Sequence, residues 1–333
     1  TCYMTRNEPS SLPAPQMEED PRFLTEQIVT YLGNKRSLLH FLGTGLEQVK
    51  KRLGKERLKA GDLFSGSGIV ARFLKQHSEE LIVNDLEEYS RVVNTCYLSN
   101  AEEVENLELD RHYRRLLRYM ETHESPGFIT ELYAPRNPDC ITADDRVFYT
   151  RRNAVYLDTA RQTISLLPAE VRPYFIAPLL AEASVHTNTS GVFKGFYKDR
   201  NGIGKFGGTG GNALSRNLGE ISLPFPVFSR FDCRYSIHCR DANELAAELP
   251  EMDVVYLDPP YNQHPYGSNY FMLNLLSSYE KPEETSRVSG IPADWKRSTY
   301  NSRQHAPEAL FRLLEDCPAK FILLPYRSEE HTS

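Results

Sequence analysis

The chain lacks the features by which membrane, exported and repetitive proteins are recognised. Its 333 residues contain no run of about 18 apolar residues, the length of a membrane-spanning helix. The N-terminal residues TCYMTRNEPSSLPAPQMEEDP include no apolar core of a signal peptide, and no internal repeat follows them. We therefore expect a soluble protein of the cytoplasm that does not bind membranes.

Cysteine is scarce and scattered, which argues against two kinds of stabilising site. No C-x-x-C pair occurs, so the spacing favours neither a zinc site nor a disulfide framework. His238, Cys239 and Asp241 are close in sequence, but alternate residues of a strand face opposite sides, and packing is favoured over metal binding. We expect no metal, and reduced thiols at the six positions Cys2, Cys96, Cys140, Cys233, Cys239 and Cys317.

The chain also lacks the overall positive charge that indicates nucleic acid binding. Its formal net charge is -6, so any basic surface must be local. A local excess occurs between residues 194 and 216, where five cations stand against Asp199 alone. Such cations can contact phosphates, and the abundant glycines allow close approach of the backbone; a flexible solvated loop is the alternative. The candidate DNA-binding residues are Lys194, Lys198, Arg200, Lys205 and Arg216.

The distribution of apolar residues predicts an α/β fold. Apolar segments at 58–64 and 81–85 flank a helical segment that begins at Ile69, and this βαβ unit implies a parallel sheet. Helical patterns also mark residues 38–53, 147–167 and 174–186, and strands resume at 234–239, 253–258 and 320–326. We predict one mostly parallel sheet with a flexible segment at 1–22, a sheet domain at 23–100 and 234–333, and an inserted, mainly helical region at 101–233.

A glycine motif, DLFSGSG at residues 62–68, follows the first predicted strand. Gly66 and Gly68 allow a tight turn and a close approach to a ligand, which the free N–H groups of the next helix can bind. Asp85 follows Gly66 by 19 residues, at the end of the next strand, where a carboxylate can accept both hydroxyls of a ribose. This pairing indicates a cofactor that contains a nucleoside. The alternative is a tight turn beside a solvated acid.

A second motif, DPPY at residues 258–261, ends the strand at 253–258. The two prolines cannot continue a strand, and they hold the Asp258 carboxylate and the neighbouring carbonyl oxygens in one arrangement. A planar amine fits this corner, because Asp258 can accept one hydrogen, the Pro259 carbonyl the other, and the ring can stack on Tyr261. The alternative is a core strand that ends in prolines and a surface acid.

These motifs, in this order and after YLGNKRSLL at residues 31–39, resemble the D12 class of adenine-specific DNA methyltransferases. The resemblance covers residues 23–326. It implies a Rossmann-like methyltransferase sheet, an inserted target-recognition domain and the cofactor S-adenosyl-L-methionine. By this resemblance Asp241 and Ala242 contact the cofactor's adenine and Asp85 its ribose. Around its methionine end the resemblance places Tyr31, Gly33, Lys35, Asp62, Phe64, Gly66 and Gly68.

The resemblance also implies a reaction. The methyl group passes to the N6 amine of adenine in a specific sequence of double-stranded DNA, after the base is flipped out. The catalytic corner is then Asp258, Pro259, Pro260 and Tyr261, while His264 stands where arginine is common in part of the family. Such an enzyme is the modification enzyme of a bacterial restriction-modification system, associated with the nucleoid. Its partner endonuclease acts on the same sequence without stable association.

Two other functions remain open, together with one structural question. Asp-Pro-Pro-Tyr suits any planar amine, so an RNA base or a protein glutamine amide is a second possible substrate. A catalytically silent DNA-binding or cofactor-sensing module is a third possibility. Only seven residues follow Tyr326, too few for the strand pair that completes such a sheet, and we expect a truncated or altered sheet edge of lower stability.

Overall fold

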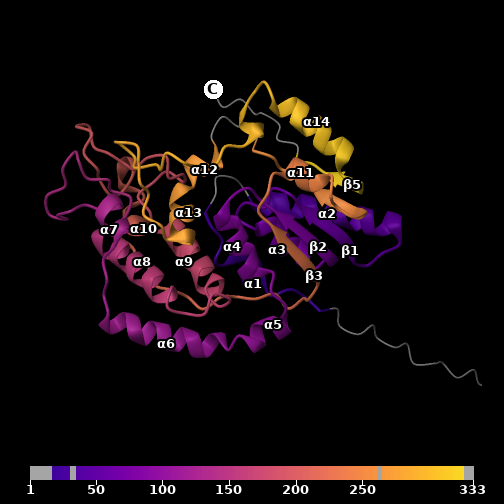
Figure 1. The fold of residues 1–333 in the computed structure, drawn as a ribbon, viewed down its shortest axis with the longest axis horizontal. Helices are drawn as coiled ribbons and strands as arrows, with labels where there is room; N and C mark the ends of the chain where they lie inside the picture. Colours follow the sequence, from indigo (N-terminus) through magenta and orange to yellow (C-terminus); the bar gives the residue numbers. More distant parts are fainter. Residues whose placement is uncertain (1–16, 31–34, 261–264, 326–333) are drawn as a thin grey trace, which may run out of the picture.

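A computed structural model describes residues 17–30, 35–260 and 265–325, with the backbone alone for residues 35–37. Its centre is a five-stranded sheet in the order β3-β2-β1-β4-β5 (Figure 1). All four strand pairs are parallel, which confirms the predicted α/β fold. The strands are β1 (Leu58–Asp62), β2 (Ser78–Asn84), β3 (Arg234–His238), β4 (Met252–Tyr256) and β5 (Ala319–Leu323).

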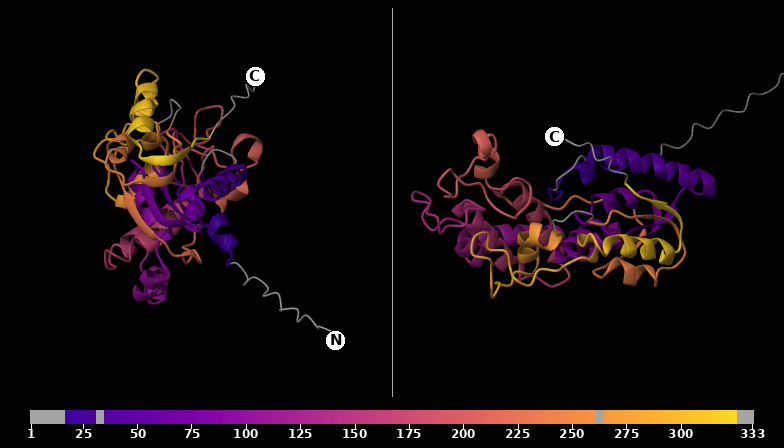
Figure 2. Two further views of the ribbon diagram at one scale, coloured as in Figure 1. Left: turned by 90° about the vertical axis from the view of Figure 1, so that its right-hand side faces the viewer. Right: turned by 90° about the horizontal axis from the view of Figure 1, so that it is seen from above.

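Helices cover both faces of the sheet because side chains of each strand alternate between two apolar clusters. One cluster joins Ala60, Leu81 and Val254 to helices α2 (Lys35–Leu53) and α3 (Ile69–Lys75). The other joins Ile82 and Val255 to helices α11 (Ala242–Ala246) and α14 (Ala306–Asp316). The sheet is therefore the middle one of three layers, with helices on each side of it (Figure 2).

The middle of the chain is helical, as its pattern predicts, and lies at one end of the elongated molecule (Figures 1 and 2). Its helices share one apolar core with helices next to the sheet, because Phe128, Leu157 and Phe175 belong to the same cluster as Val92 and Phe271. The boundaries at 101 and 233 stay a prediction. The helices are α4 (Glu88–Tyr97), α5 (Ala101–Asn106), α6 (Leu109–Thr122), α7 (Phe128–Tyr133), α8 (Arg151–Ile164), α9 (Pro173–Val185), α10 (Leu214–Leu218), α12 (Tyr266–Asn269) and α13 (Phe271–Ser278).

Several predicted boundaries are wrong for local reasons. Helix α8 begins at Arg151 rather than at residue 147, because the Thr150 hydroxyl caps it by accepting from the Asn153 N–H at 3.1 Å. Strand β2 begins at Ser78 rather than at 81, since it pairs with Leu58 at the start of β1. Strand β4 ends at Tyr256, two residues before Asp258. Residues 1–16 and Tyr326, on which the expectations about the two chain ends depend, lie outside the described residues.

The N-terminal part that is described is attached to the segment just before β3. The short helix α1 (Pro21–Thr25) is capped by Asp20, and Glu19 accepts hydrogen bonds from the Ser229 hydroxyl at 2.5 Å and the Arg230 N–H at 2.9 Å. Over the described ranges, no helix is both long enough and apolar enough to cross a bilayer.

Candidate active site

The two sequence motifs meet at the carboxyl edge of the sheet. Strand β1 lies between β2 and β4, so Asp62 at its end pairs with Val83 on one side and Tyr256 on the other. The loops that follow these neighbouring strands line one cavity that is open to solvent. Ligands of parallel α/β sheets bind at this edge. Of the residues predicted from the sequence, the cavity is lined by Phe64, Asp85, Asp241, Ala242 and Pro260.

The glycine motif turns the chain out of β1 in a left-handed conformation. Gly66 has φ 52° and Gly68 has φ 77°, values that residues with a Cβ rarely adopt. A Cβ at Gly68 would also lie 3.0 Å from the Asn94 side-chain oxygen. Gly68 immediately precedes α3. The sequence therefore requires glycine here for the backbone, and contact with a cofactor stays a prediction.

Asp85 holds this turn closed from the end of β2. Its carboxylate accepts the Gly66 N–H at 2.8 Å and the Glu87 N–H at 2.9 Å. The side chain is buried, and burial raises its pKa although both N–H groups oppose that rise. The alternative of a solvated acid is therefore wrong. Each carboxylate oxygen keeps a second lone pair for a further donor on the cavity side.

Asp62 is a fully buried acid with an unmet requirement for hydrogen bonds. Neither of its carboxyl oxygens accepts a well-formed hydrogen bond within the described part of the chain. Burial raises its pKa to about 8, and the nearby negative charges of Asp85 and Asp258 act in the same direction, whereas the neighbouring Phe64 N–H and Ser65 side chain lower it. A buried acid of this kind is stabilised in its ionised form only when a cation or a set of donors reaches it.

The Asp-Pro-Pro corner is held from several sides. The Leu257 N–H donates to the Leu323 carbonyl at 3.0 Å, and the Tyr256 hydroxyl donates to the Asp258 carboxylate at 3.4 Å. Pro259 and Pro260 are buried and lack N–H groups, so their burial leaves no donor unpaired. Asp258 is half-buried. Tyr261 and His264 lie outside the described residues.

The predicted adenine contacts follow β3. Asp241 caps α11 by accepting the Asn243 N–H at 2.8 Å and the Glu244 N–H at 3.2 Å. Asn84 ties this turn to the end of β1, since its amide nitrogen donates to the Leu63 and Arg240 carbonyls. The structure thus places Asp241 and Ala242 beside the glycine motif, although 173 to 180 residues separate the two in sequence.

The remaining cofactor candidates come from the segment before α2. Arg72 of α3 binds this segment, because its guanidinium donates to the carbonyls of Phe23, Glu26 and Gln27 at 2.7–2.9 Å. The glycine-motif helix therefore holds the chain that leads to residue 31. Tyr31, Gly33 and the side chain of Lys35 lie outside the described residues.

One acid that lines the cavity, Glu87, was not among the site residues predicted from the sequence. The Glu87 carboxylate accepts from the Asn274 amide at 2.7 Å, and burial raises its pKa to about 7. Its position two residues after Asp85 was the only available signal. Further lining residues come from the polar segment between α13 and α14, which carried no recognisable motif: Lys296, Ser298, Tyr300 and Asn301.

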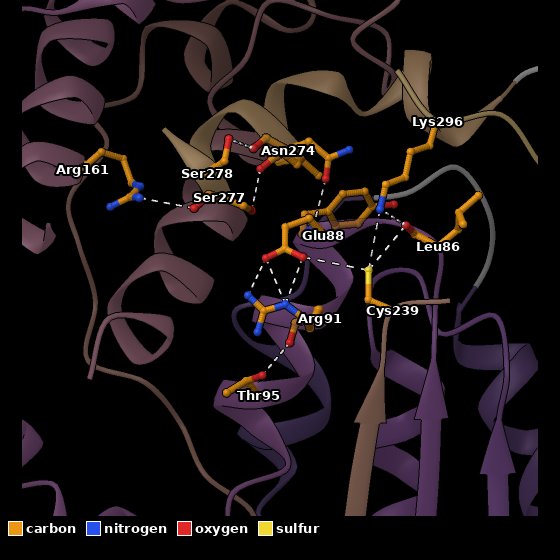
Figure 3. A network of polar contacts seen from close by, with 12 residues as sticks. Leu86, Glu88, Arg91, Thr95, Arg161, Cys239, Asn274, Ser277, Ser278 and Lys296 are labelled. Carbon is orange, nitrogen blue, oxygen red and sulfur yellow. Dashed lines mark hydrogen bonds and ion pairs between the residues drawn. The ribbon is translucent and has the colours of Figure 1, made fainter. Parts of the chain in front are cut away.

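Figure 3 shows how this polar segment meets the ends of β2 and β3. The Lys296 ammonium donates to the Leu86 carbonyl at 3.0 Å and lies 3.9 Å from the Cys239 sulfur. Cys239 itself contacts the Leu86 carbonyl at 3.6 Å and Glu88 at 3.9 Å. In the ranges that the structure describes, no group of three or more acidic, histidine or cysteine side chains is arranged to hold a metal.

The basic loop is folded against the region after the catalytic corner. Phe193 is buried, and its N–H donates to the Asn269 carbonyl of α12 at 2.7 Å. Lys198 pairs with Gly204 through an isolated β-bridge. Arg216 donates to the Thr189 carbonyl at 3.2 Å, so part of its hydrogen-bonding capacity is used within the loop. The side chains of the five candidate DNA-binding residues are exposed, and their role stays a prediction.

Gly267 in α12 touches the polar segment so closely that we expect alanine to disturb the cavity. A Cβ there would lie 2.4 Å from the Lys296 carbonyl oxygen and 3.2 Å from the Glu87 carboxylate. Because the nearest atom is backbone, the segment must move, and we expect Gly267→Ala to lower the free energy of unfolding by about 1–3 kcal/mol.

Urea unfolding followed by circular dichroism measures this effect. Gly195→Ala is the matched control, because a Cβ at Gly195 meets no atom within 4 Å. Its free energy of unfolding should stay within about 0.5 kcal/mol of the parent. Equal stabilities of the two variants would show that the contact with Lys296 is not tight in solution.

Comparisons with known proteins agree with the motifs. The sequence profile of the D12 class N6 adenine-specific DNA methyltransferases matches residues 31–304. The type II methyltransferase M.CviAII of Paramecium bursaria Chlorella virus 1 is 30% identical over 311 residues, which are 90% of this chain and 84% of the relative. M.NlaIII of Neisseria lactamica is 27% identical over the same shares. M.FokI of Planomicrobium okeanokoites is 25% identical over 90% of this chain but only 44% of the relative. No solved structure is significantly similar.

Proposed function

Because the chain belongs to the family of D12 class N6 adenine-specific DNA methyltransferases, we propose that it uses S-adenosyl-L-methionine to methylate the N6 amine of adenine in a specific duplex sequence. The observation that carries this proposal is the meeting of Asp85, Asp241 and the Asp258 corner at one cavity. Its relatives are named type II methyltransferases and modification methylases. We accordingly propose that it protects DNA against an endonuclease of the same specificity.

The residues around the cavity fit this cofactor. Asp62 offers a buried carboxyl without a well-formed hydrogen bond in the described residues, which suits the ammonium of the methionine end. Asp85 has lone pairs for the ribose hydroxyls, and Asp241 with Ala242 lies where an adenine ring would enter. By the family resemblance, Tyr31, Gly33 and Lys35 hold the methionine end from the other side. When bound, the cofactor supplies an electrophilic methyl group on a sulfonium.

The chain's own contribution to the reaction is to orient the acceptor amine. The N6 lone pair of adenine is delocalised into the ring, so it must be localised before it attacks. We assign this role to the Asp258 carboxylate and the Pro259 carbonyl, each of which accepts one amine hydrogen. The Tyr256 hydroxyl fixes the carboxylate. The base must first leave the duplex, and Tyr261 is the proposed stacking partner.

The basic loop is the proposed DNA contact. Lys194 directly follows the buried Phe193, whose backbone is bonded to α12. A phosphate bound by this loop therefore lies near the segment that follows the catalytic corner. Contacts of this kind fix the position of the duplex, whereas the base sequence is recognised by other groups.

The raised pKa of Asp62 predicts a dependence of cofactor affinity on pH. In the cofactor-free protein this carboxyl is protonated below its pKa of about 8, whereas pairing with an ammonium requires the carboxylate. Cofactor binding should therefore tighten as pH rises from 6 towards 8, and Asp62→Asn should lose this part of the pH profile.

Equilibrium binding of S-adenosyl-L-methionine to both proteins between pH 6 and 9 tests this prediction. The amine of the ligand titrates equally in the two experiments, so the difference between the profiles belongs to Asp62. Parallel profiles would exclude Asp62 as the partner of the ammonium.

One assay distinguishes the proposed reaction from its alternatives. The protein is incubated with S-adenosyl-L-methionine labelled in the methyl group and, separately, with duplex DNA, RNA and protein, and the labelled product is identified by mass spectrometry. We expect N6-methyladenine in duplex DNA. Label in RNA or in a glutamine amide would support the second substrate class, and no label in any substrate would support a silent binding module.

A further inference from the structure

The residues from Lys296 to Asn301, which we call the 296–301 segment, form one wall of the cavity. Four of the six residues line it, namely Lys296, Ser298, Tyr300 and Asn301. The segment lies between α13 and α14 and includes the 3-10 turn η2 (Thr299–Asn301). The Ser298 hydroxyl caps this turn by accepting the Tyr300 N–H at 3.3 Å. The segment thus has a defined local structure at the cavity.

Asn301 connects the segment to the catalytic corner. Its side-chain amide donates to the Pro260 carbonyl at 3.3 Å. That carbonyl belongs to the peptide plane through which the chain leaves the corner, and proline restricts only φ, so the orientation of the plane depends on ψ. A donor on this oxygen therefore restrains the ψ torsion of Pro260, which the proline ring leaves free.

Tyr300 connects the same segment to the helix that carries the predicted adenine contacts. Its hydroxyl donates to the Asn243 side-chain oxygen at 2.6 Å, in the first turn of the helix that Asp241 caps. Its ring meets the Phe64 ring edge-on, with centroids 5.3 Å apart. Tyr300 is buried and so packs between the glycine motif and the predicted adenine contacts.

Lys296 fixes the beginning of the segment. Its ammonium donates to the Leu86 carbonyl just after β2, as Figure 3 shows. Its own carbonyl oxygen lies so near Gly267 of α12 that a Cβ there would be 2.4 Å away. Six consecutive residues therefore contact the loops after β1, β2, β3 and β4. These loops carry the proposed catalytic residues and most of the proposed cofactor contacts, whereas Tyr31, Gly33 and Lys35 belong to the segment that leads into α2.

We propose that the 296–301 segment couples the cofactor site to the catalytic corner, with Asn301 as a positioning residue for the Pro260 carbonyl and Tyr300 as the brace of the adenine subsite. This inference rests on the proposed methylation of adenine from S-adenosyl-L-methionine. Asn301 bonds to the catalytic corner and Tyr300 to the helix of the predicted adenine contacts, so their variants should affect different kinetic constants.

Asn301→Asp tests the catalytic end. The change keeps the shape of the side chain but replaces the donating amide by an acceptor, which cannot hold a carbonyl oxygen. We expect the single-turnover rate at saturating cofactor to fall by about 10- to 100-fold, since small misplacements of reacting groups have effects of this size. The dissociation constant of S-adenosyl-L-methionine should change less than about threefold, because the lost bond does not face the adenine subsite.

Tyr300→Phe tests the cofactor end. The ring and its packing against Phe64 are retained while the hydrogen bond to Asn243 is lost, so the protein should fold. We expect the cofactor dissociation constant to rise about two- to tenfold, the range of one hydrogen bond, with a near-normal rate at saturation. Thr299→Ala is the matched control within the same turn, because the Thr299 side chain is exposed; both constants should stay unchanged.

The proposal is supported if Asn301→Asp lowers mainly the single-turnover rate and Tyr300→Phe raises mainly the dissociation constant of the cofactor. A parental rate in Asn301→Asp, or equal losses of rate and cofactor affinity in both variants, would overturn it in favour of a purely structural role. Failure of the parental protein itself to methylate adenine would instead overturn the proposed function, and this inference with it. The parental measurement therefore separates the two failures.

Discussion

Asp258→Ala should lower the single-turnover rate of adenine methylation by about 10²–10³-fold or more, the effect of removing a group that stabilises developing charge. Without the carboxylate, only the Pro259 carbonyl remains to accept a hydrogen of the amine, and the lone pair stays delocalised. The rate is measured with labelled S-adenosyl-L-methionine, excess enzyme and duplex DNA. Cofactor affinity should fall far less, because the role that we propose for Asp258 is to bind the acceptor amine and not the cofactor.

Two further variants make this result interpretable. Asp258→Asn keeps the shape of the side chain and one acceptor oxygen, but the loss of charge should still reduce the rate strongly. Glu315→Ala removes an exposed acid of α14 and should have a parental rate. A parental rate in Asp258→Ala would refute the assignment of this residue.

The second large effect is expected on DNA binding. Simultaneous replacement of Lys194, Lys198, Arg200 and Lys205 by glutamine removes four exposed cations from the basic loop. If each contacts a phosphate, the slope of log K against log salt should decrease in magnitude by up to about 3.6. Affinity should fall most at low salt. Fluorescence anisotropy of a labelled duplex, titrated at several salt concentrations, measures both quantities.

The control removes the same charge from another surface. Helix α6 exposes four arginines, Arg111, Arg114, Arg115 and Arg118, and their replacement by glutamine gives a protein with the same net charge. Its salt slope should be close to that of the parent, as should the melting temperatures of both variants. The same loss of slope in both variants would mean that overall charge, and not the loop, governs binding.

The local motifs were readable from the sequence because their chemistry depends on neighbouring residues. Glycine at 66 and 68 follows from positive φ angles, and the prolines at 259 and 260 follow from the need to stop a strand. The parallel order of the strands around β1 follows from the βαβ pattern. These features need only a few consecutive residues, so the sequence determines them directly.

Other errors arose where a distant partner decides the outcome. The sequence did not show that the acid after β2 is buried against backbone N–H groups, because Gly66 is 19 residues away and is brought there by the turn. It also could not separate the helices of the middle region from those of the sheet domain. Phe128 and Phe271 join one core only because α7 and α13 meet in the folded chain.

By itself the sequence determined the α/β class and the order of the motifs, since spacing and backbone stereochemistry are local; the chemistry of Asp258 stays a prediction. Only the tertiary structure decided which other residues enclose the cavity. Asn301 reaches Pro260 across 41 residues and Tyr300 reaches Asn243 across 57. Neither stands in a recognisable motif, because a hydrogen bond requires only that two atoms meet, and that meeting is fixed by the packing of α11, α13 and α14 rather than by any pattern along the chain.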